Sequence, residues 1–225
     1  MDKYVIIVAG GQGLRMGSPL PKQFLLLNGF PVIFHTVEKF SKALPGIRTI
    51  VVLHPDYISY WHQLKEKFSF DCECTLCTGG SERFFSVKNG LDTIGTDEAL
   101  VGIHDAVRPL VSADVIRRSY SEAEKSGAVV PVVSATDSVR LVDDRGDSQT
   151  IDRSRVQLVQ TPQVFRLSLL RKAYSQPYTA MFTDDASVVE ASGHHISLVN
   201  GNRENIKLTT PIDLKLAELA MKQTR

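Results

Sequence analysis

Short apolar segments alternate with longer amphipathic ones along most of this chain, and this alternation limits the fold more than any other feature. The apolar segments are Tyr4–Ala9, Arg48–His54, Cys72–Thr78, Leu100–Val107 and Ala128–Ser134. The unbroken apolar character of Tyr4–Ala9 is typical of a strand that is covered on both faces. Strands that alternate with helices in this way predict a largely parallel sheet with right-handed crossovers. We therefore expect a Rossmann-like, three-layer α/β/α fold with a mostly parallel, mixed central sheet.

The segments between the strands show apolar residues at helical spacing. Pro31 opens a predicted helix in which Phe34, Val37 and Leu44 share one side. Further helices are expected from a cap at Asp56 to Phe68, from a cap at Ser81 through Ile94, over Ala113–Ser126 up to Gly127, over Leu167–Ser175, over Asp184–Ser192 up to Gly193, and from Thr210 and Pro211 onwards. Short strands are also expected at Val156–Gln160, Ile196–Val199 and Asn205–Leu208.

The regular alternation stops at about residues 136–156. Ser138–Asp143 alternates apolar and polar residues, residues 144–147 read Asp-Arg-Gly-Asp, and Ser148–Ile151 follows as a second short run. This pattern predicts a β-hairpin that projects from the sheet as an arm. Because an isolated hairpin is marginally stable, we expect the arm to pack against a second subunit.

The overall composition excludes some classes of partner. The chain has 225 residues and a net charge of +1, so its surface as a whole favours neither nucleic acid nor an anionic membrane. The first apolar run spans only Tyr4–Ala9, which is too short for a secretory signal or a membrane span. No repeat or linker divides the sequence, and we expect residues 1–225 to form a single cytoplasmic domain.

Cys72, Cys74 and Cys77 lie close together in the sequence. A structural zinc site would need a second pair of Cys or His ligands, and none stands out. In a strand, Cys72 and Cys74 would share one face and Cys77 would lie on the other. We interpret them as buried thiols in a reducing compartment, with a metal site as the alternative.

A glycine-rich loop follows the first strand and is the main candidate for a binding site. It reads Ala9-Gly10-Gly11-Gln12-Gly13-Leu14-Arg15-Met16-Gly17 and leads to Pro21-Lys22-Gln23-Phe24. Ligands of open parallel sheets bind beyond the carboxyl ends of the strands, and glycines allow backbone N–H groups to approach phosphate oxygens. Arg15 and Lys22 add two positive charges. The loop lacks the Gly-Lys-Ser/Thr of a P-loop, and Met16 breaks a dinucleotide fingerprint. A glycine-rich turn without a ligand is the remaining alternative.

Five motifs in order along the chain resemble those of one known family. They are AGGQGLRMG with PKQF at 9–24, HDAVRP at 104–109, TPQVF at 161–165, TDDAS at 183–187 and NIKLTTPIDL at 205–214. Together they resemble the 2-C-methyl-D-erythritol 4-phosphate cytidylyltransferases, a branch of the nucleotidyltransferase superfamily. The resemblance runs from about Tyr4 to Leu219.

The resemblance implies a role for each group of residues in the use of CTP. It places the triphosphate at Ala9, Gly10, Gly11 and Gly13, the cytosine at Gly80, Ser81, Arg83 and Ser86, a magnesium ion on Asp105, and catalytic cations at Arg15, Lys22 and Lys207. Many relatives have Asp at the position of Ser81, so a base contact through that side chain is in doubt. Arg83 is equally suited to hold the loop through a carboxylate.

Each of these roles has a structural alternative. Asp105 could cap the loop that follows its strand, and Lys207 could be a solvated residue at a sheet edge. The triphosphate chemistry that the resemblance implies requires a metal, which favours Asp105 as a ligand. We interpret His104 as structural, because the implied reaction needs no base.

For the acceptor phosphate, the resemblance points to Arg108, Ser138, Arg153 and Thr161. Ser138 stands where the family often has Thr, and TDDAS is interpreted as structural support. In the family the arm crosses to a second subunit, which implies a homodimer with a shared acceptor site. An arm folded back within one subunit is the alternative.

The implied reaction joins a cytidylyl group from CTP to 2-C-methyl-D-erythritol 4-phosphate and releases pyrophosphate, in the non-mevalonate pathway to isoprenoids. A phosphate monoester is already an anionic nucleophile, which agrees with the lack of a Ser/His/Asp or Cys/His constellation. Two alternatives stay open. One is a ribitol-5-phosphate cytidylyltransferase, which has the same motifs. The other is an inactive nucleotide-binding regulatory protein, although Lys22, Asp105 and Lys207 are all present.

Overall fold

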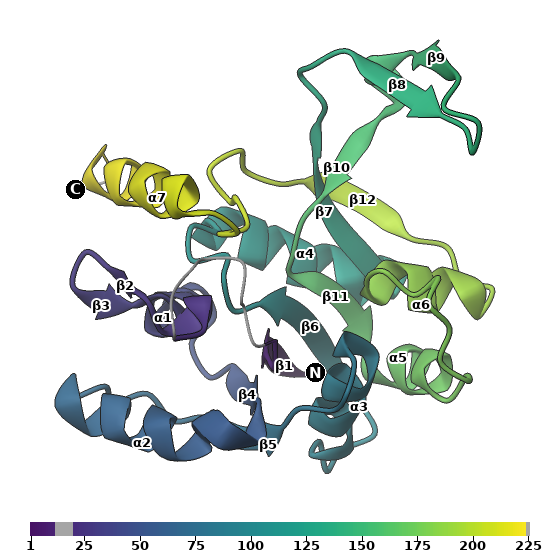
Figure 1. Ribbon diagram of the computed structural model, residues 1–225. Coiled ribbons are helices and arrows are strands. Elements are labelled where there is room, and N and C mark those ends of the chain that lie inside the picture. The colour runs from purple at the N-terminus through teal and green to yellow at the C-terminus, as the bar shows by residue number, and fades with distance from the viewer. Residues whose placement is uncertain (12–19, 224–225) are drawn as a thin grey trace.

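The computed structural model describes residues 1–11 and 20–223 of the chain, so the predicted site residues Gly13 and Arg15 lie outside the described residues. In the described part, eight strands form the central sheet (Figure 1). The strands of the sheet are β1 (Asp2–Ala9), β4 (Arg48–Leu53), β5 (Thr75–Thr78), β6 (Ala99–Asp105), β7 (Ala128–Ser134), β10 (Gln157–Val159), β11 (Gln163–Arg166) and β12 (Ser197–Asn200). Strands β1, β4, β5 and β6 run parallel, while β10 and β11 run antiparallel to their neighbours. The expected mixed, mostly parallel sheet is confirmed.

Helices cover both faces of this sheet. They are α1 (Val32–Ala43), α2 (Ile58–Lys67), α3 (Arg83–Asp92), α4 (Ala113–Ser126), α5 (Leu167–Tyr174), α6 (Asp185–Ala191) and α7 (Pro211–Gln223). Alternate residues of β1 explain the two layers, because Val5 and Ile7 pack with α1, α2 and α4 whereas Ile6 packs with α3, α5 and α6. The predicted α/β/α architecture is confirmed. None of the described helices combines the length and apolar character that a membrane span requires.

The starts of two helices differ from the predictions. Asp56 does not cap α2, because a 3-10 turn, η3 (Pro55–Tyr57), comes first and the helix begins only after Tyr57. Ser81 does not cap α3, whose N-cap is Glu82. Neither N-cap residue, Tyr57 of α2 or Glu82 of α3, bonds the first N–H groups of its helix through its side chain, so the cap pattern did not locate either start.

Two predictions for strands were also wrong, one in part and one entirely, and a further strand was missed. The Cys72–Thr78 strand begins only at Thr75. Residues 205–208 form no strand, because Leu208 donates its N–H to the carbonyl of Val107 at 2.9 Å and the segment crosses the end of β6 as a loop. The antiparallel strand β11, which lies between β6 and β7, was not predicted. Its four residues are too few to show a period.

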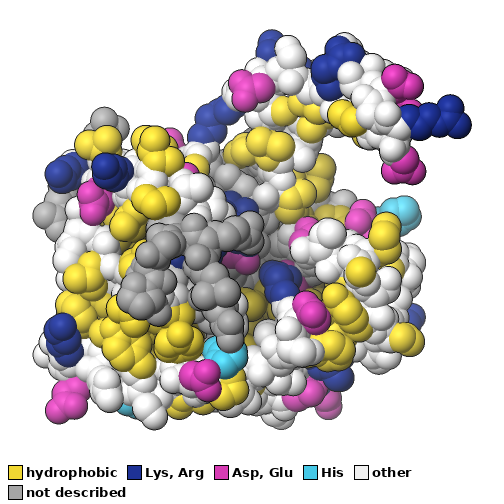
Figure 2. Space-filling model, viewed as in Figure 1, with side chains coloured by type: hydrophobic (Ala, Val, Ile, Leu, Met, Phe, Trp, Pro, Cys, Tyr) yellow, Lys and Arg dark blue, Asp and Glu magenta, His cyan; other side chains and the backbone are white. Residues whose placement is uncertain are grey.

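The predicted hairpin is present as β8 (Val139–Val142) paired with β9 (Ser148–Ile151). It stands away from the body of the molecule, with charged side chains near its tip (Figure 2). The short 3-10 turn η4 (Arg153–Arg155) leads from it to β10. Two other short elements precede α1, namely the turn η2 (Lys22–Phe24) and the hairpin of β2 (Leu26–Leu27) and β3 (Phe30–Pro31).

Candidate active site

A hollow of about 440 Å³ opens beyond the carboxyl ends of β1 and β6. The residues that line it are Val8, Ala9, Gly10, Gly11, Lys22, Gln23, Gly80, Ser81, Glu82, Arg83, Ser86, Asp105, Ala106, Val107 and Lys207. Many of the residues that the sequence indicated for a nucleotide therefore lie around one cavity. Its position agrees with the rule that open parallel sheets bind ligands at this edge.

The described start of the glycine-rich loop is held by Gln23. This buried side chain donates from Nε2 to the carbonyl oxygens of Ala9 at 2.8 Å and of Gly11 at 3.1 Å. Lys22 precedes it in η2, so the bonds that fix Gln23 also place Lys22 beside the loop. The PKQF motif thus positions a cation next to backbone that can approach phosphate.

The loop before α3 forms the opposite wall. Ser86 Oγ accepts from the Gly80 N–H at 3.1 Å and donates to the Glu82 carbonyl at 3.1 Å. A Cβ added at Gly10 would lie 3.0 Å from the same hydroxyl, which shows how closely the two loops approach. Ser86 is therefore buried structure that shapes the loop, whereas Ser81 is exposed at the rim.

Asp105 lies at the end of β6 among three cationic side chains. Its carboxylate oxygens are 3.0 Å from Lys207 Nζ, 3.3 Å from Arg108 Nε and 3.8 Å from Arg83 Nε. Burial alone would raise the pKa of Asp105, but these cations together hold it well below its usual range. The carboxylate is thus ionised at any physiological pH.

Arg83 is fixed by a second carboxylate. Its Nη1 and Nη2 atoms donate to the two oxygens of Asp185 at 2.9 and 2.7 Å. The Asp185 oxygen nearer to Nη1 also accepts from the Tyr174 hydroxyl at 2.6 Å. Two roles were considered for Arg83, contact with the ligand or fixing the loop through a carboxylate. The structure shows the bond to a carboxylate that the second role requires.

His104 and Thr161 lie behind Asp105. Burial lowers the pKa of His104 to about 4, so its imidazole is neutral at pH 7. His104 Nε2 lies 3.1 Å from the carbonyl oxygen of Arg108, which requires Nε2 to carry the proton. The Thr161 hydroxyl then donates to Nδ1 at 2.9 Å and accepts from the Asp105 N–H at 3.2 Å. Its one hydrogen is used within the protein, and the structural interpretation of His104 is confirmed.

Comparison with known proteins decides the family. The chain matches one family model, described as IspD: 2-C-methyl-D-erythritol 4-phosphate cytidylyltransferase, over residues 3–223. The chain belongs to this family. A protein of that name from Bacteroides thetaiotaomicron is 52% identical over 216 residues, which cover 96% of this chain and 98% of the relative. One from Bacillus velezensis is 41% identical over 225 residues, which cover 99% and 97%.

Solved structures agree with this assignment. The crystal structure of 4-diphosphocytidyl-2C-methyl-D-erythritol synthase from Anaerococcus prevotii is similar to this chain with a TM-score of 0.84, at 27% identity, over 98% of this chain and 96% of that one. The structure of 2-C-methyl-D-erythritol 4-phosphate cytidylyltransferase from Francisella tularensis has a TM-score of 0.81 at 33% identity, over 97% and 99%. The family and the fold that the motifs predicted are confirmed.

The four predicted acceptor residues of this cytidylyltransferase fall into two places. Arg108 and Thr161 lie beside Asp105. Ser138 and Arg153 are exposed at the base of the arm, and Arg153 Nη1 donates to the Thr136 carbonyl at 2.7 Å. Neither of these two lines the cavity of its own subunit.

The donor set of this cytidylyltransferase fits a magnesium ion that is bound together with a nucleotide. In the described ranges, no three His, Cys, Asp or Glu side chains gather to hold a metal by themselves. Asp105 offers a single ionised carboxylate at the cavity wall. Magnesium usually takes one or two protein carboxylates and completes its shell with phosphate oxygens and water. The three cysteines are free thiols that are half-buried rather than buried as predicted, and Cys77 packs on the opposite core from Cys72 and Cys74, as expected.

A polar scaffold behind Lys207 was not predicted from the sequence. The backbone N–H of Asn202 donates to Gln160 Oε1 at 3.3 Å, and Gln160 Nε2 donates back to the Asn202 carbonyl at 2.9 Å. Asn205 Nδ2 donates to the Thr161 carbonyl at 2.9 Å. These bonds fix the loop that carries Lys207. Asn205 and Thr161 belong to the NIKL and TPQVF motifs, but Gln160 and Asn202 lie outside them, and the sequence gave no hint of their partners.

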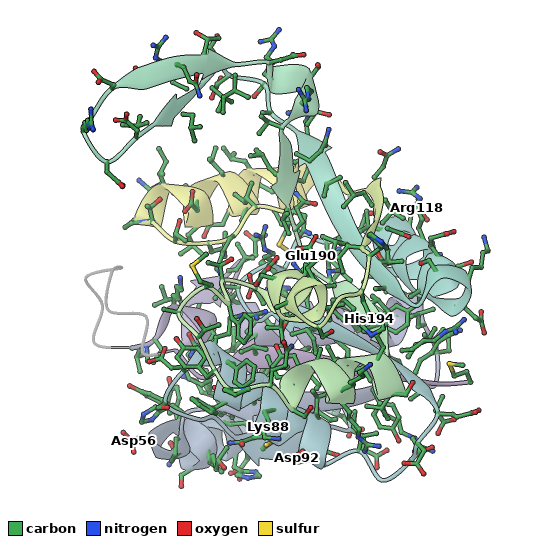
Figure 3. The ribbon with its side chains drawn as sticks, turned by 90° about the vertical axis from the view of Figure 1, so that its right-hand side faces the viewer. Asp56, Lys88, Asp92, Arg118, Glu190 and His194 are labelled. Carbon is green, nitrogen blue, oxygen red and sulfur yellow. The ribbon has the colours of Figure 1, made fainter. Side chains whose placement is uncertain are left out.

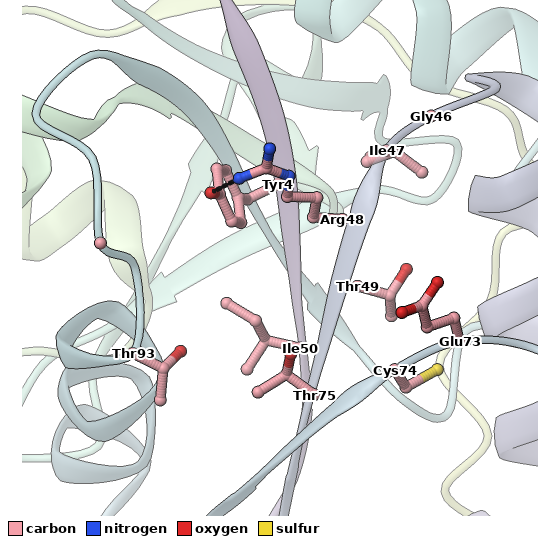
Figure 4. A pocket seen from close by; sticks show the side chains of 11 residues that line it. Tyr4, Gly46, Ile47, Arg48, Thr49, Ile50, Glu73, Cys74, Thr75 and Thr93 are labelled. Carbon is pink, nitrogen blue, oxygen red and sulfur yellow. Dashed lines mark hydrogen bonds between the residues drawn. The ribbon is translucent and has the colours of Figure 1, made fainter.

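A second hollow, of about 510 Å³, lies at the amino ends of β1, β4 and β5 (Figure 4). Arg48 Nη1 donates to the Tyr4 hydroxyl at 2.5 Å there, and Glu73 and Cys74 lie on the other wall. None of the family motifs contributes to it. It lies at the amino ends of the parallel strands, whereas Asp105 lies at their carboxyl ends.

Proposed function

We propose that this cytidylyltransferase joins the cytidylyl group of CTP to 2-C-methyl-D-erythritol 4-phosphate, giving 4-diphosphocytidyl-2-C-methyl-D-erythritol and pyrophosphate. The observation that carries the proposal is the cavity in which Lys22, Asp105 and Lys207 lie around one space with the glycine-rich loop. That set of groups suits a triphosphate with a metal. The base and the acceptor follow from family membership over residues 3–223.

In the proposed complex, CTP lies between the two loops. The backbone of Ala9, Gly10 and Gly11 faces the triphosphate, together with the cation of Lys22. The same role is proposed for Gly13 and Arg15 from the family motif alone. Cytosine lies against the opposite wall, where the backbone at Gly80 and Ser81 can read its amino and carbonyl groups. Ser86 takes part by shaping this wall, since its hydroxyl already bonds Gly80.

The reaction then needs positioning and charge rather than a base. The acceptor phosphate is an anion at neutral pH and attacks the α-phosphorus in line as pyrophosphate leaves. Lys22, Lys207 and Arg15 neutralise the charge that builds on the phosphates. His104 is buried and neutral and already bonded through both ring nitrogens, so it takes no proton from the acceptor.

Asp105 would hold the magnesium ion of the bound nucleotide. A magnesium ion in that position would polarise the phosphate oxygens and offset their charge. Lys207 and Arg108 pair with this carboxylate, so both cations lie next to the proposed metal ligand.

The proposed acceptor site needs a second copy of the chain. Arg108 pairs with Asp105 of one subunit, and Thr161 supports it through His104, whose Nε2 bonds the Arg108 carbonyl. Ser138 and Arg153, at the base of the arm, do not line the cavity of their own subunit. A homodimer with crossed arms would bring Ser138 and Arg153 of one copy to the acceptor of the other.

The test is to incubate the protein with CTP, Mg²⁺ and each acceptor in turn, and to identify the product by mass spectrometry. We expect 4-diphosphocytidyl-methylerythritol and an equal amount of pyrophosphate. Product with ribitol 5-phosphate alone would reassign the acceptor. CTP binding without any pyrophosphate would instead favour the regulatory protein.

A further inference from the structure

The side chain of Arg83 is engaged by carboxylates on two different elements. Its Nη1 and Nη2 atoms donate a bidentate pair of hydrogen bonds to the carboxylate of Asp185, at the start of α6. Its Nε atom faces Asp105, at the end of β6, across 3.8 Å. The planar guanidinium therefore links α6 to the proposed metal ligand, and its geometry is set by both contacts.

Asp185 has no contact with the cavity. Its side chain is fully buried, and it is not among the residues that line the hollow. Helix α6, which carries the labelled Glu190, packs beside α5, which brings the Tyr174 hydroxyl to the same carboxylate (Figure 3). A carboxylate in such surroundings is costly unless it is paired, so its partners are held tightly in place.

The start of α6, which carries Asp185, is fixed by further hydrogen bonds. Asp184 caps α6 by accepting from the Ser187 N–H at 2.9 Å, and its other oxygen accepts from Gln163 Nε2 at 2.7 Å. Gln163 Oε1 in turn accepts from the Ala186 N–H at 2.8 Å. These bonds attach helix α6 to β11 in the centre of the sheet. Asp185 therefore has a fixed position, and its carboxylate fixes the guanidinium of Arg83.

Arg83 is also the first residue of α3, directly after the loop that contains Gly80. Whatever fixes its side chain fixes the distance between that loop and Asp105. We propose that Asp185, supported by Tyr174, is a positioning residue for cytidylyl transfer. Through Arg83 it keeps the loop at Gly80, which binds the base, at a fixed distance from Asp105. This inference rests on the proposed function.

Loss of the contact between Asp185 and Arg83 should have a specific kinetic effect. The loop and Asp105 hold opposite ends of one nucleotide, so loosening Arg83 disturbs the placement of CTP. Of the acceptor residues, Arg153 has no bond to this network and Arg108 meets it only at Asp105, so the KM for methylerythritol phosphate is expected to change much less than the KM for CTP. A residue that only stabilises the fold would instead lower the amount of active enzyme and leave both KM values unchanged.

The experiment uses Asp185→Asn, Arg83→Gln and the double variant, in the full-length protein, with kcat and both KM values measured. We expect Asp185→Asn to lower kcat/KM for CTP by about 10²-fold, the loss typical of a small misplacement at a reacting centre. The double variant is expected to lose no more than the worse single variant, because both changes break one linkage. Asp97→Asn is the matched control, since it removes a carboxylate from an exposed Arg171 pair that precedes the amino end of β6, whereas Asp105 lies at the carboxyl end of that strand.

Thermal unfolding of each variant and calorimetry with CTP complete the test. Tyr174→Phe, which removes only the hydroxyl, is expected to weaken CTP binding in the same direction and by less. It replaces Asp185→Asn if that variant does not fold. Unchanged kinetics per folded molecule would overturn the proposal, and so would losses that add in the double variant, because Arg83 would then bind the nucleotide independently of Asp185. If the wild-type protein makes no product, the proposed function fails, while CTP affinity still tests the linkage.

Discussion

Single cationic side chains carry much of the proposed chemistry, and Lys22 is the one whose position the structure explains best. It sits on η2, which the buried Gln23 ties to the glycine-rich loop. We predict that Lys22→Ala lowers kcat by about 10²–10³, or about 3–4 kcal/mol of barrier, as for the loss of one preorganised donor. A pyrophosphate-release assay measures this. Lys42→Ala, on the exposed side of α1, is the control. A fall of less than about threefold would remove Lys22 from the mechanism.

Cys72 is the residue at which pH should have the clearest effect. A hydrogen bond from Cys74 lowers the pKa of the Cys72 thiol to about 7, whereas burial raises the pKa of Cys77. The thiolate is the reactive form, so alkylation of Cys72 should rise as the pH increases through about 7 and level off above it. Iodoacetamide labelling followed by peptide mass spectrometry checks this, with Cys72→Ser as the control. Preferential labelling of Cys77 at pH 7 would contradict it.

Among the elements, the loop before α3 depends on a close approach of its backbone. A Cβ at Gly80 would run into Cβ of Phe85, which is part of the helix itself and cannot give way. We predict that Gly80→Ala moves the loop and raises the KM for CTP by about tenfold, equivalent to about 1.4 kcal/mol of binding. Steady-state kinetics measure this effect. Gly95→Ala is the control, because nothing lies within 4 Å of an added Cβ there. Equal KM values for the two variants would show that the loop adapts.

Elements with a strong period or a clear stop signal were predictable from the sequence. The helix Ala113–Ser126, which ends at the left-handed Gly127, and the strand Ala128–Ser134 match the prediction at both ends. The arm was also predictable, because alternation and turn residues coincide there. Strand β11 was not, since its four residues show no period and become a strand only when β6 and β7 lie on either side.

In the candidate site, too, some residues could be predicted from the sequence and others could not. Lys22, Asp105 and Lys207 were recognisable because each belongs to a motif and each lines the cavity. Asp185 and Gln160 were not, because they act through partners 102 and 42 residues away in the sequence. Sequence spacing contains no information on such pairs until the sheet has brought its strand ends together.

At the scale of the whole molecule, one feature has no structural partner within the described chain. The arm exposes Leu141 and Val142, and the neighbouring strand β10 exposes Leu158 and Val159, each by about half of its surface or more. A two-stranded hairpin with exposed apolar residues needs a surface to pack on. A second copy, which would also receive Arg153, satisfies this need in the proposed dimer.

We therefore predict that Leu141→Asp combined with Val142→Asp converts the protein to monomers, because four buried carboxylates per dimer would lack partners. Analytical ultracentrifugation measures the mass. The monomer should bind CTP with unchanged affinity, since the cavity that contains Lys22 and Asp105 belongs to one subunit. Its KM for methylerythritol phosphate should rise about tenfold or more, the loss expected when a charged hydrogen-bond donor such as Arg153 leaves a phosphate. Asp143→Ala with Asp144→Ala, at the exposed turn, is the control. A monomer that keeps the wild-type acceptor KM would show that the arm folds back on its own subunit.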